Sequence, residues 1–394
     1  MERVILPPAE WRKRPDLSEL VDTLGDARFV GGSVRDTLLG FPVADIDLAT
    51  PLSPTAVMDR LKAVGIRAVP TGIEHGTVTA VLDSGPVEVT TLRHDVSTDG
   101  RRAKVAFTDD WPADAARRDF TINALYADPK SGEIFDYFSG LEDLDARRIR
   151  FIGDPLQRIA EDHLRILRFF RFLARFGDVP DRQGLDACTA RAKDLMALSR
   201  ERIADELLKL LVAQDAVRVT GLMIERGIFL PVLPEIASVD GLAKLSAAEQ
   251  SAAIAPDPIR RLSALLPRDA ATADQVGARL KLSNAQRKRL IAAGSPLPQA
   301  SPEALAYRFG QQTATDLLLL SDRTVDARLV RDWAVPRLPI GGGALVARGL
   351  AKGPDVARAL RAVEDRWIAE GFPDVARVNT LADEAVAQVL REPR

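Results

Sequence analysis

Two aspartates that flank a single isoleucine, Asp45 and Asp47, are the first residues whose spacing suggests chemistry. The surrounding segment is apolar, and alternation along a strand would place both carboxylates on one face. Like charges on one face repel unless a cation lies between them, and Mg²⁺ is the hard cation that carboxylate and phosphate oxygens bind together. The pair predicts a Mg²⁺ site, and a solvated strand end is the alternative.

A third carboxylate, Glu88, alternates with valines in Val87-Glu88-Val89-Thr90-Thr91. The valines would point inward, which leaves Glu88 on the other face of the strand. With Asp45 and Asp47 it could complete a two-metal site, whose ions lie about 3.5 to 4 Å apart, activate an attacking hydroxyl and stabilise a leaving pyrophosphate. Taken alone, Glu88 is more simply a solvent-facing strand residue.

A strand-to-helix turn precedes these carboxylates. The apolar pair Phe29-Val30 breaks at Gly31 and Gly32 and continues as Ser33-Val34-Arg35-Asp36. Glycines let a backbone approach a phosphate, and a helix N-terminus offers free NH groups to it. The segment could therefore bind phosphate, although a Gly-Gly pair by itself is more often a tight turn.

A mixed α/β fold is expected to position these residues. Up to about residue 150, short β-like runs alternate with amphipathic helical runs. Helices are expected near 33–39 and 54–63, and strands at Phe29-Val30, 44–48, 67–69, 77–82 and 86–92. Beyond Asp154 the strand signals end, and leucine and alanine recur at helical spacing almost to the C-terminus, which predicts an all-helical second part.

Length and composition limit the class of protein. The 394 residues exceed the roughly 250 to 300 that one hydrophobic core supports, so two or more domains are expected. No apolar run approaches the ~20 residues of a membrane span, and no secretion signal is found, so we expect a cytoplasmic protein. A single cysteine, Cys188, excludes internal disulfides and multi-cysteine zinc sites and is expected to be an ordinary buried or half-buried thiol.

The net charge of −2 argues weakly against a nucleic-acid partner, but the positive charge is concentrated in two basic islands. Residues 146–177 contain eight arginines and three acids. Residues 278–294 contain five basic residues and no acid. Each island could bind RNA or be a solvated helix face.

Residues of the first island could recognise a nucleotide base. Asp162, Arg165 and Arg168 follow at three-residue steps, which makes helix neighbours, and Arg171 and Arg175 lie further round the same helix. Cytosine and adenine both present an amino donor beside a ring-nitrogen acceptor, whereas uracil and guanine reverse that order. A carboxylate beside a guanidinium complements cytosine and adenine, so Asp162 and Arg165 could act as a protein template. A surface ion-pair ladder is the alternative.

Four ordered motifs together resemble a known family. They are Gly31-Gly32-Ser33-Val34-Arg35-Asp36 with Asp45-Ile46-Asp47; Arg117-Arg118-Asp119-Phe120-Thr121-Ile122-Asn123-Ala124; Glu161-Asp162-His163-Leu164-Arg165; and Glu201-Arg202-Ile203 with Glu206. The chain resembles the class II CCA-adding enzymes and bacterial poly(A) polymerases of the polymerase-β nucleotidyltransferase superfamily. The resemblance covers about residues 28–210, and residues 349–372 resemble the family's C-terminal pattern more loosely.

The resemblance implies roles for particular residues. Asp45 and Asp47 would bind the metal ions, here Mg²⁺, and Glu88 would be the third catalytic carboxylate. Asp162 and Arg165 would take the template role, while Arg118 and Asp119 would hold the ribose and phosphates of the nucleotide. Whether Arg117 or Arg118 makes the main contact is left open. The expected nucleotide-binding residues are Gly31, Gly32, Ser33, Arg35, Arg118, Asp119, Asp162, Arg165, Arg168 and Arg171.

The implied activity is addition of C, C and A to the 3′ end of tRNA from CTP and ATP, without a nucleic-acid template. The segment His94–Phe107, with Asp99-Gly100-Arg101-Arg102, resembles the flexible loop that lets full CCA-adding enzymes switch from CTP to ATP. Polyadenylation and partial CC or A addition are the alternatives within the family. A catalytically inactive RNA-binding module is the alternative outside it, but such a module has no use for two uncompensated carboxylates, Asp45 and Asp47.

The implied architecture has three parts. Residues 1–150 would form a catalytic α/β head with a mixed sheet of the polymerase-β type. Residues 151–215 would form a helical neck that recognises the base, and residues 216–394 a helical body and tail that bind tRNA. The partners are tRNA, through its 3′ end and acceptor arm, with ATP and CTP. No oligomeric state is predicted.

Overall fold

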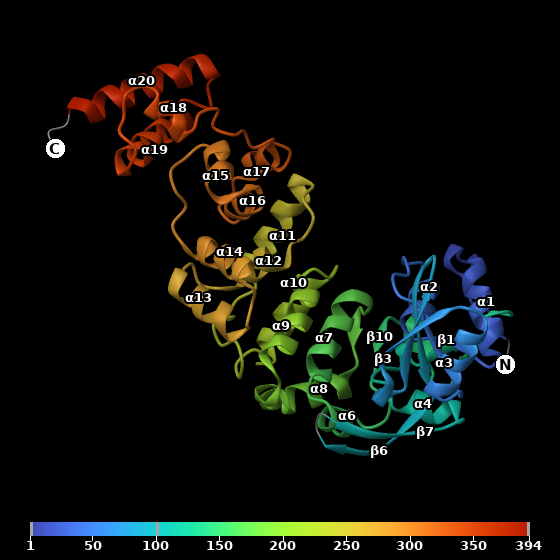
Figure 1. The fold of residues 1–394 in the computed structure, drawn as a ribbon. Coiled ribbons are helices and arrows are strands. Elements are labelled where there is room, and N and C mark those ends of the chain that lie inside the picture. The colour runs from blue at the N-terminus through green and yellow to red at the C-terminus, as the bar shows by residue number, and fades with distance from the viewer. Residues whose placement is uncertain (1–2, 100–101, 392–394) are drawn as a thin grey trace. The chain divides into compact units, whose positions relative to one another are not determined.

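The computed structural model describes residues 3–99 and 102–391 (Figure 1). The chain divides into two compact units, Met1–Ile236 and Ala237–Arg394. The finer division of the first unit at residues 150 and 215 stays a prediction. None of the helices in the described ranges combines the length and the apolar composition that crossing a membrane requires.

A seven-stranded mixed sheet forms the centre of the first unit, in the order β3-β4-β5-β2-β1-β8-β9. Strands β2 and β5 run parallel, and the other neighbours run antiparallel. The strands are β1 (Arg28–Val30), β2 (Asp47–Thr50), β3 (Arg67–Gly72), β4 (Thr77–Leu82), β5 (Gly85–Thr91), β8 (Leu125–Ala127) and β9 (Ile134–Asp136). The expected α/β head with a mixed sheet is confirmed.

The position of β2 corrects one detail of the sequence analysis. The strand was expected over residues 44–48, but it begins at Asp47 because its pairing with β5 begins there, opposite Glu88. Asp45 therefore precedes the strand, and the two aspartates are not alternating residues of one strand. The three-residue strands β8 and β9 were not expected, since such short segments carry no measurable alternation.

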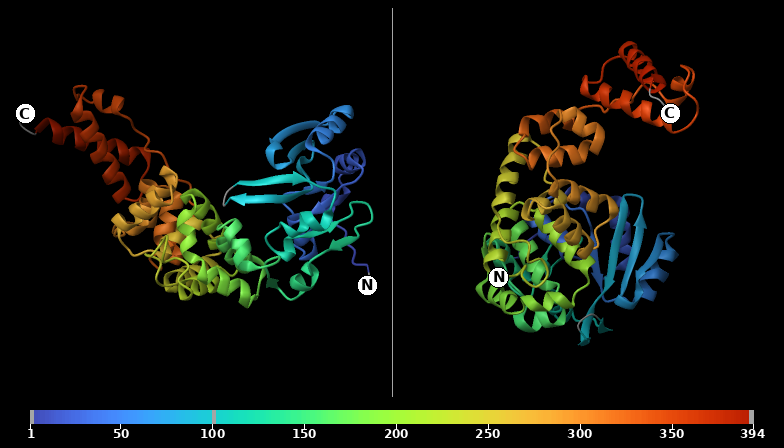
Figure 2. Two further views of the ribbon diagram at one scale, coloured as in Figure 1. Left: turned by 90° about the horizontal axis from the view of Figure 1, so that it is seen from below. Right: turned by 90° about the vertical axis from the view of Figure 1, so that its left-hand side faces the viewer.

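The segment after β5 forms a separate two-stranded ribbon (Figure 2). Strands β6 (Arg93–Asp99) and β7 (Arg102–Phe107) pair antiparallel, from Arg93 opposite Phe107 to Asp99 opposite Arg102. The expected flexible loop over residues 94–107 is thus paired backbone in its described part. Gly100 and Arg101 lie outside the described residues.

Helices cover the sheet and then continue the chain. Helix α3 packs on β3, β4 and β5, while α2 packs on β1 and β8. The helices of this unit are α1 (Pro15–Leu24), α2 (Gly32–Leu38), α3 (Pro54–Ala63), α4 (Trp111–Ala116), α5 (Gly140–Asp145), α6 (Pro155–Glu161), α7 (Arg165–Phe176), α8 (Arg182–Ala190), α9 (Arg200–Leu211) and α10 (Ala216–Glu225), with 3₁₀ turns η1 (Glu10–Lys13), η2 (Ile73–His75), η3 (Thr121–Asn123) and η4 (Ala192–Ala197). Strand β10 (Arg148–Ile149) pairs with β11 (Val179–Pro180), and β11 departs from the all-helical character expected beyond residue 154.

Helix α7 is strongly amphipathic. Its apolar face buries Phe169 and Phe172, which pack with Phe120 and Phe151 of the preceding chain. The rings of Phe151 and Phe169 are stacked with centroids 5.6 Å apart. Burial of such a ring contributes about 1.5 to 3 kcal/mol for each side chain. Because the apolar face of α7 packs inward, the arginines of this helix lie on its other face.

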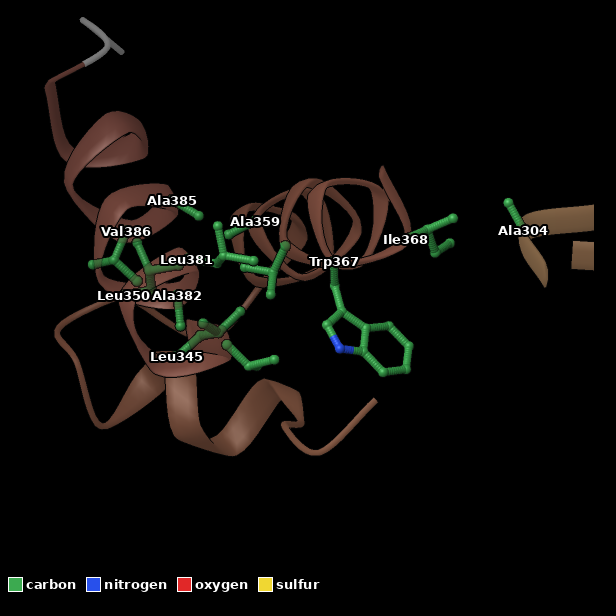
Figure 3. Packing of buried hydrophobic residues seen from close by; sticks show 12 residues of the cluster. Ala304, Leu345, Leu350, Ala359, Trp367, Ile368, Leu381, Ala382, Ala385 and Val386 are labelled. Atoms are coloured by element: carbon green, nitrogen blue, oxygen red, sulfur yellow. The ribbon is translucent and has the colours of Figure 1, made fainter. Parts of the chain in front are cut away.

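All the secondary-structure elements that the structure describes in the second unit are helices. Its helices are α11 (Asp240–Ala252), α12 (Pro258–Leu265), α13 (Ala270–Arg279), α14 (Asn284–Gly294), α15 (Pro302–Phe309), α16 (Gln311–Leu319), α17 (Thr324–Arg331), α18 (Gly342–Val346), α19 (Pro354–Ala369) and α20 (Val375–Arg391). One apolar cluster joins α18, α19 and α20 through residues such as Leu345, Trp367 and Leu381 (Figure 3).

Charged groups are also buried in the second unit. Glu249 accepts from Arg260 at 2.8 Å and from Arg261 at 2.9 Å, and all three residues are buried. Arg289, from the second basic island, donates to Asp316 at 2.8 Å and to Asp257 at 2.7 Å. Part of this island therefore neutralises acids within the protein instead of facing solvent.

Glycine at position 241 lets two helices of this unit approach closely, so we predict that Gly241→Ala destabilises the protein. An ideal Cβ at Gly241 of α11 would lie 2.1 Å from the carbonyl oxygen of Ala264 at the end of α12. Relief of this clash requires backbone displacement, and overpacking of this kind costs typically about 1 to 3 kcal/mol. Urea denaturation of the full chain measures the loss in the free energy of unfolding.

The matched control is Gly343→Ala in α18, where an added Cβ meets nothing within 4 Å. Alanine in place of glycine in a helix stabilises by roughly 0.5 to 1 kcal/mol, so this variant should be neutral or more stable. Equal stability of the two variants would contradict the close-approach argument.

Candidate active site

The parallel pairing of β2 with β5 brings two of the predicted carboxylates together. Asp47 lies opposite Glu88 in the strand register, and Asp47 is half-buried while Asp45 and Glu88 are exposed. Burial and the nearby charges of Glu88 and Asp45 raise the pKa of Asp47 from 3.8 to about 6, against the opposing charge of Arg118. Negative charge is thus crowded at this edge of the sheet.

These acids suit Mg²⁺ by their chemistry. They offer hard oxygen ligands, and a cation would relieve the repulsion that raises the pKa of Asp47. Within the described residues, however, no three His, Cys, Asp or Glu side chains are grouped so that they could hold a metal ion. A complete three-carboxylate centre, as expected with Glu88, is therefore not preassembled, and Mg²⁺ would need further oxygen ligands from phosphate or water.

A cavity of about 520 Å³ adjoins Asp47 and is lined largely by arginine. Eight of the expected nucleotide-binding residues line it: Gly31, Gly32, Arg35, Arg118, Asp119, Asp162, Arg165 and Arg168. The other lining residues are Asp47, Arg93, Arg117, Asn123 and Phe172. Cationic walls beside a carboxylate edge are suited to a polyphosphate that arrives with a divalent cation.

Two expected residues do not reach this cavity. Ser33 is fully buried, and its hydroxyl donates to the carbonyl of Val30 at 3.3 Å. Arg171 lies on α7 beyond the cavity wall and donates to Glu206 at 2.5 Å. In both cases a protein acceptor bonds to the side chain and the residue does not line the cavity, so the assignment of Ser33 and Arg171 to nucleotide binding stays a prediction.

The glycine turn allows an arginine to approach the backbone. Gly31 has φ of 70°, a left-handed conformation that glycine adopts readily, and its amide donates to the carbonyl of Leu125 at 3.2 Å. An added Cβ would lie 3.4 Å from a guanidinium nitrogen of Arg118. Glycine at position 31 therefore leaves room for the Arg118 side chain beside the backbone, whether or not the turn also binds phosphate.

Asp114 of α4 holds both members of the Arg117-Arg118 pair. Arg117 donates to it at 2.9 Å through Nε, and Arg118 donates at 3.3 Å through Nη2. The Tyr126 hydroxyl donates to the same carboxylate at 2.6 Å. Burial would raise the pKa of Asp114, but the charges of Arg118 and Arg117 outweigh it, so the pKa is lowered and the carboxylate stays ionised.

Asp119, which also lines the cavity, is held by a second set of hydrogen bonds. Arg168 donates two bonds to Oδ2, at 2.8 and 2.6 Å, and Asn123 donates to Oδ1 at 2.9 Å. Burial alone would raise the pKa of Asp119, but Arg168 and these hydrogen bonds lower it to about 2. Asp119 is thus an anion with a defined orientation, which can accept from a ribose hydroxyl.

Asp162 and Arg165 line the same cavity but are not neighbours on one helix. Asp162 lies in the break between α6 and α7, and α7 begins at Arg165. Asp162 accepts from Arg202 at 2.9 Å, while Arg165 donates to Glu161 at 2.5 Å. The expected side-by-side pair on a continuous helix is therefore wrong, because the chain leaves helical geometry at Asp162.

Three cavity residues, Arg93, Asn123 and Phe172, were not among the expected site residues, and Arg117, whose contact with the nucleotide was left open, also lines the cavity. Arg117 and Asn123 belong to the same motif as Asp119, which places them near it along the chain. Phe172 was hidden among the apolar residues of α7. Arg93 has no sequence signal, since it reaches the cavity only through the turn from β5 into β6.

Two sequence families match parts of this chain. The family described as "Poly A polymerase head domain" matches residues 27–150. The family described as "Probable RNA and SrmB- binding site of polymerase A" matches residues 181–239.

Curated relatives match over longer spans. The mouse protein named "CCA tRNA nucleotidyltransferase 1, mitochondrial" is 36% identical over 368 residues, which cover 88% of this chain and 84% of the relative. Its human counterpart is 35% identical over 368 residues with the same coverage. The "CCA-adding enzyme" of Streptococcus gordonii is 43% identical over 209 residues, which cover 52% of this chain and 51% of the relative.

Solved structures share the fold. The Bacillus stearothermophilus CCA-adding enzyme in complex with CTP matches with a TM-score of 0.76 at 27% identity, over 95% of this chain and 99% of that chain. The Thermotoga maritima CCA-adding enzyme complexed with tRNA matches with a TM-score of 0.61 at 19% identity, over 95% of this chain and 94% of that chain. The second likeness shows the fold alone.

The raised pKa of Asp47 predicts a stability change for Asp47→Asn. This carboxyl ionises near pH 4 in the unfolded chain but near pH 6 in the folded protein. The difference lowers the free energy of unfolding progressively as pH rises from about 4 to about 6. The neutral amide avoids this penalty. We expect the free energy of unfolding at pH 7.5 to rise by about 1 to 3 kcal/mol, with no gain below about pH 4.

Thermal unfolding in EDTA across pH 4 to 8 measures this difference, with EDTA present to remove divalent cations. The matched control is Asp83→Asn in the exposed turn between β4 and β5. A pH-independent effect of Asp47→Asn, equal to that of the control, would disprove charge crowding at β2.

Proposed function

We propose a function on the premise that the chain belongs to the family of CCA tRNA nucleotidyltransferases, which the long matches to the mouse and human relatives establish. The activity is the addition of C, C and A to the 3′ end of tRNA, from CTP and ATP and without a nucleic-acid template. Each step forms a bond from the terminal 3′ oxygen to the α-phosphorus of the nucleotide. It breaks the bond between the α- and β-phosphates, releases pyrophosphate and frees the proton of the hydroxyl.

One observation carries the proposal: a half-buried carboxylate in a crowded anionic edge lines the same cavity as a group of arginines. Asp47 supplies the carboxylate, and Arg35, Arg118 and Arg168 are among the cations. A nucleoside triphosphate needs cationic donors along its phosphates and a carboxylate edge near the reacting phosphorus. The cavity presents both.

The metal site is proposed at the carboxylate edge. Asp45 and Asp47 would hold Mg²⁺, with Glu88 beside them on β5. When bound, the ion would neutralise charge on these acids and on the phosphate oxygens. The protein's own contribution is positional: Arg117 and Arg118, both held by Asp114, would face the phosphates.

Recognition of the nucleotide is proposed for other residues that line the cavity. Asp119, ionised and held by Arg168 and Asn123, is oriented to accept from a ribose hydroxyl. Asp162 and Arg165 would contact the base edge as separate groups, each held by its own partner. An acceptor and a donor placed independently still complement the edges that cytosine and adenine share.

The remaining assignments follow the family. We assign base recognition to residues 151–215 and tRNA binding to residues 216–394. A cytoplasmic location stays a prediction, since the mouse and human relatives carry "mitochondrial" in their names. Polyadenylation is the alternative activity, because the head matches a family named for poly(A) polymerase.

Removal of either proposed metal ligand should abolish transfer. For Asp45→Ala and Asp47→Ala, we expect CMP transfer onto tRNA that lacks its CCA end to fall by far more than tenfold, while the tRNA dissociation constant stays close to that of wild type. The carboxylates act on the reacting oxygens and not on the body of the tRNA. A residual rate above about a tenth of wild type, a loss below about 1.4 kcal/mol, would refute the metal assignment.

The wild-type protein distinguishes the activities in the same assay. With CTP alone the tRNA should gain two residues, with both nucleotides three, and with ATP alone it should gain no poly(A) tail. Long A tails from ATP alone would favour polyadenylation over CCA addition.

Loss of the Asp162 carboxylate should relax the choice of base. Asp162→Ala removes the acceptor that repels the carbonyl groups of uracil and guanine, so discrimination against UTP relative to CTP should fall by about 1 to 3 kcal/mol. Single-turnover transfer of each of the four nucleotides onto tRNA lacking CCA measures the change. Asp205→Ala, an exposed α9 residue paired with Lys209, is the matched control.

Arg165→Ala should alter the nucleotide preference in the same assay, because it removes the donor of the base-recognition pair. If Asp162→Ala and Arg165→Ala slow all four nucleotides by the same factor, these residues are structural and the protein-template proposal fails.

A further inference from the structure

Asp114 is a buried hub on which several elements converge. Its side chain is 1% exposed, and it lies on α4, outside the cavity lining. It accepts from Arg117 and Arg118, from the hydroxyl of Tyr126 on β8, and from the backbone amide of Arg93 at 3.2 Å. Arg93 is the first residue of β6, so the root of the β6–β7 ribbon is bound to the same carboxylate as the two arginines.

We propose that Asp114 is a positioning residue that couples the ribbon to the arginines that grip the triphosphate. The proposal rests on the proposed function, because it takes a nucleoside triphosphate as the ligand of the cavity. Asp114 itself would touch no nucleotide. It would act by setting where Arg117 and Arg118 lie and by fixing the ribbon root beside them.

The geometry at the two oxygens supports this coupling. Oδ1 accepts from Arg117 and from the Arg93 amide, and Oδ2 accepts from Arg118 and Tyr126. Each oxygen therefore serves two donors, and both arginines share a single anion. A displacement of the Arg93 amide would shift Asp114 Oδ1, which also accepts from Arg117. A movement of the ribbon would in this way move the arginine that faces the phosphates.

The hub also reaches the carboxylate edge. The Arg118 guanidinium is bound to Asp114 and to the Tyr126 hydroxyl, and Arg118 lines the same cavity as Asp47. A shift of Arg118 would thus alter both its contact with phosphate and its position relative to Asp47. Arg93 and both arginines line the cavity, so the ribbon root is part of the cavity wall.

The first test is nucleotide affinity. Asp114→Asn keeps the shape of the side chain but removes its charge and turns an NH₂ group toward the donors. We expect the dissociation constants of CTP and ATP, measured by calorimetry on the full chain, to rise roughly tenfold or more. Asp110→Asn is the control at the start of the same helix, because the Asp110 side chain caps α4 by accepting from the amide of Ala113.

The second test is a double-mutant cycle with the ribbon. Residues 97–104 are replaced by a two-residue turn, and addition of A to tRNA ending in CC is measured for this variant, for Asp114→Asn and for the combination. Coupling predicts that the combined loss is smaller than the product of the separate losses, by at least about threefold. Independent structural effects predict that the losses multiply.

Tyr126→Phe keeps the proposal testable if Asp114→Asn fails to fold, since it removes one donor to Oδ2 while conserving the ring. It should raise the dissociation constant of CTP severalfold. A wild-type dissociation constant in folded Asp114→Asn or in Tyr126→Phe, or multiplicative losses in the cycle, would overturn the proposal. A wild-type protein that binds CTP but transfers no nucleotide would instead refute the proposed function.

Discussion

The pairing of Arg168 with Asp119 is the interaction on which the cavity depends. It joins α7 to the head segment after α4 through two short hydrogen bonds to one carboxylate oxygen. Arg158 adds to this join by donating to the carbonyls of Arg117 and Arg118 at 2.5 and 2.6 Å. Removal of Arg168 would leave the largely buried Asp119 carboxylate without its cationic partner, which is more destabilising than loss of an exposed pair. Hydrogen bonds therefore join the residues of α7 and of the head segment that line the cavity.

Local features of the fold followed from the sequence, whereas long-range partners did not. Helix α3 and strand β4 have the expected bounds, because capping residues and alternation mark their ends. The partner of Asp162 is Arg202, forty positions along the chain, and no periodicity within the first island could indicate it. Ser33 is a second case, since its hydroxyl donates to the neighbouring carbonyl of Val30, a contact that the motif does not indicate. The motifs identify most residues that line the cavity, but they do not show which side chains are bonded to other groups of the protein.

The basic islands are less available to RNA than their arginine count suggests. Arg148 and Arg150 both bond to the buried carboxylate of Asp143, and Arg287 is paired with Asp274. Each of these arginines already has an acidic partner within the protein. The salt dependence of tRNA binding should therefore reflect far fewer contacts than the number of basic residues in the two islands.

The parallel pairing of β2 with β5 also governs when the anionic edge can exist during folding. Parallel neighbours need a crossover connection, and here α3, β3 and β4 intervene in the chain between the two strands. During synthesis, Asp47 emerges well before Glu88, and loop-closure entropy delays their contact until the intervening hairpin and helix have formed. The two carboxylates therefore come close enough to repel each other only after most strands of the sheet have formed.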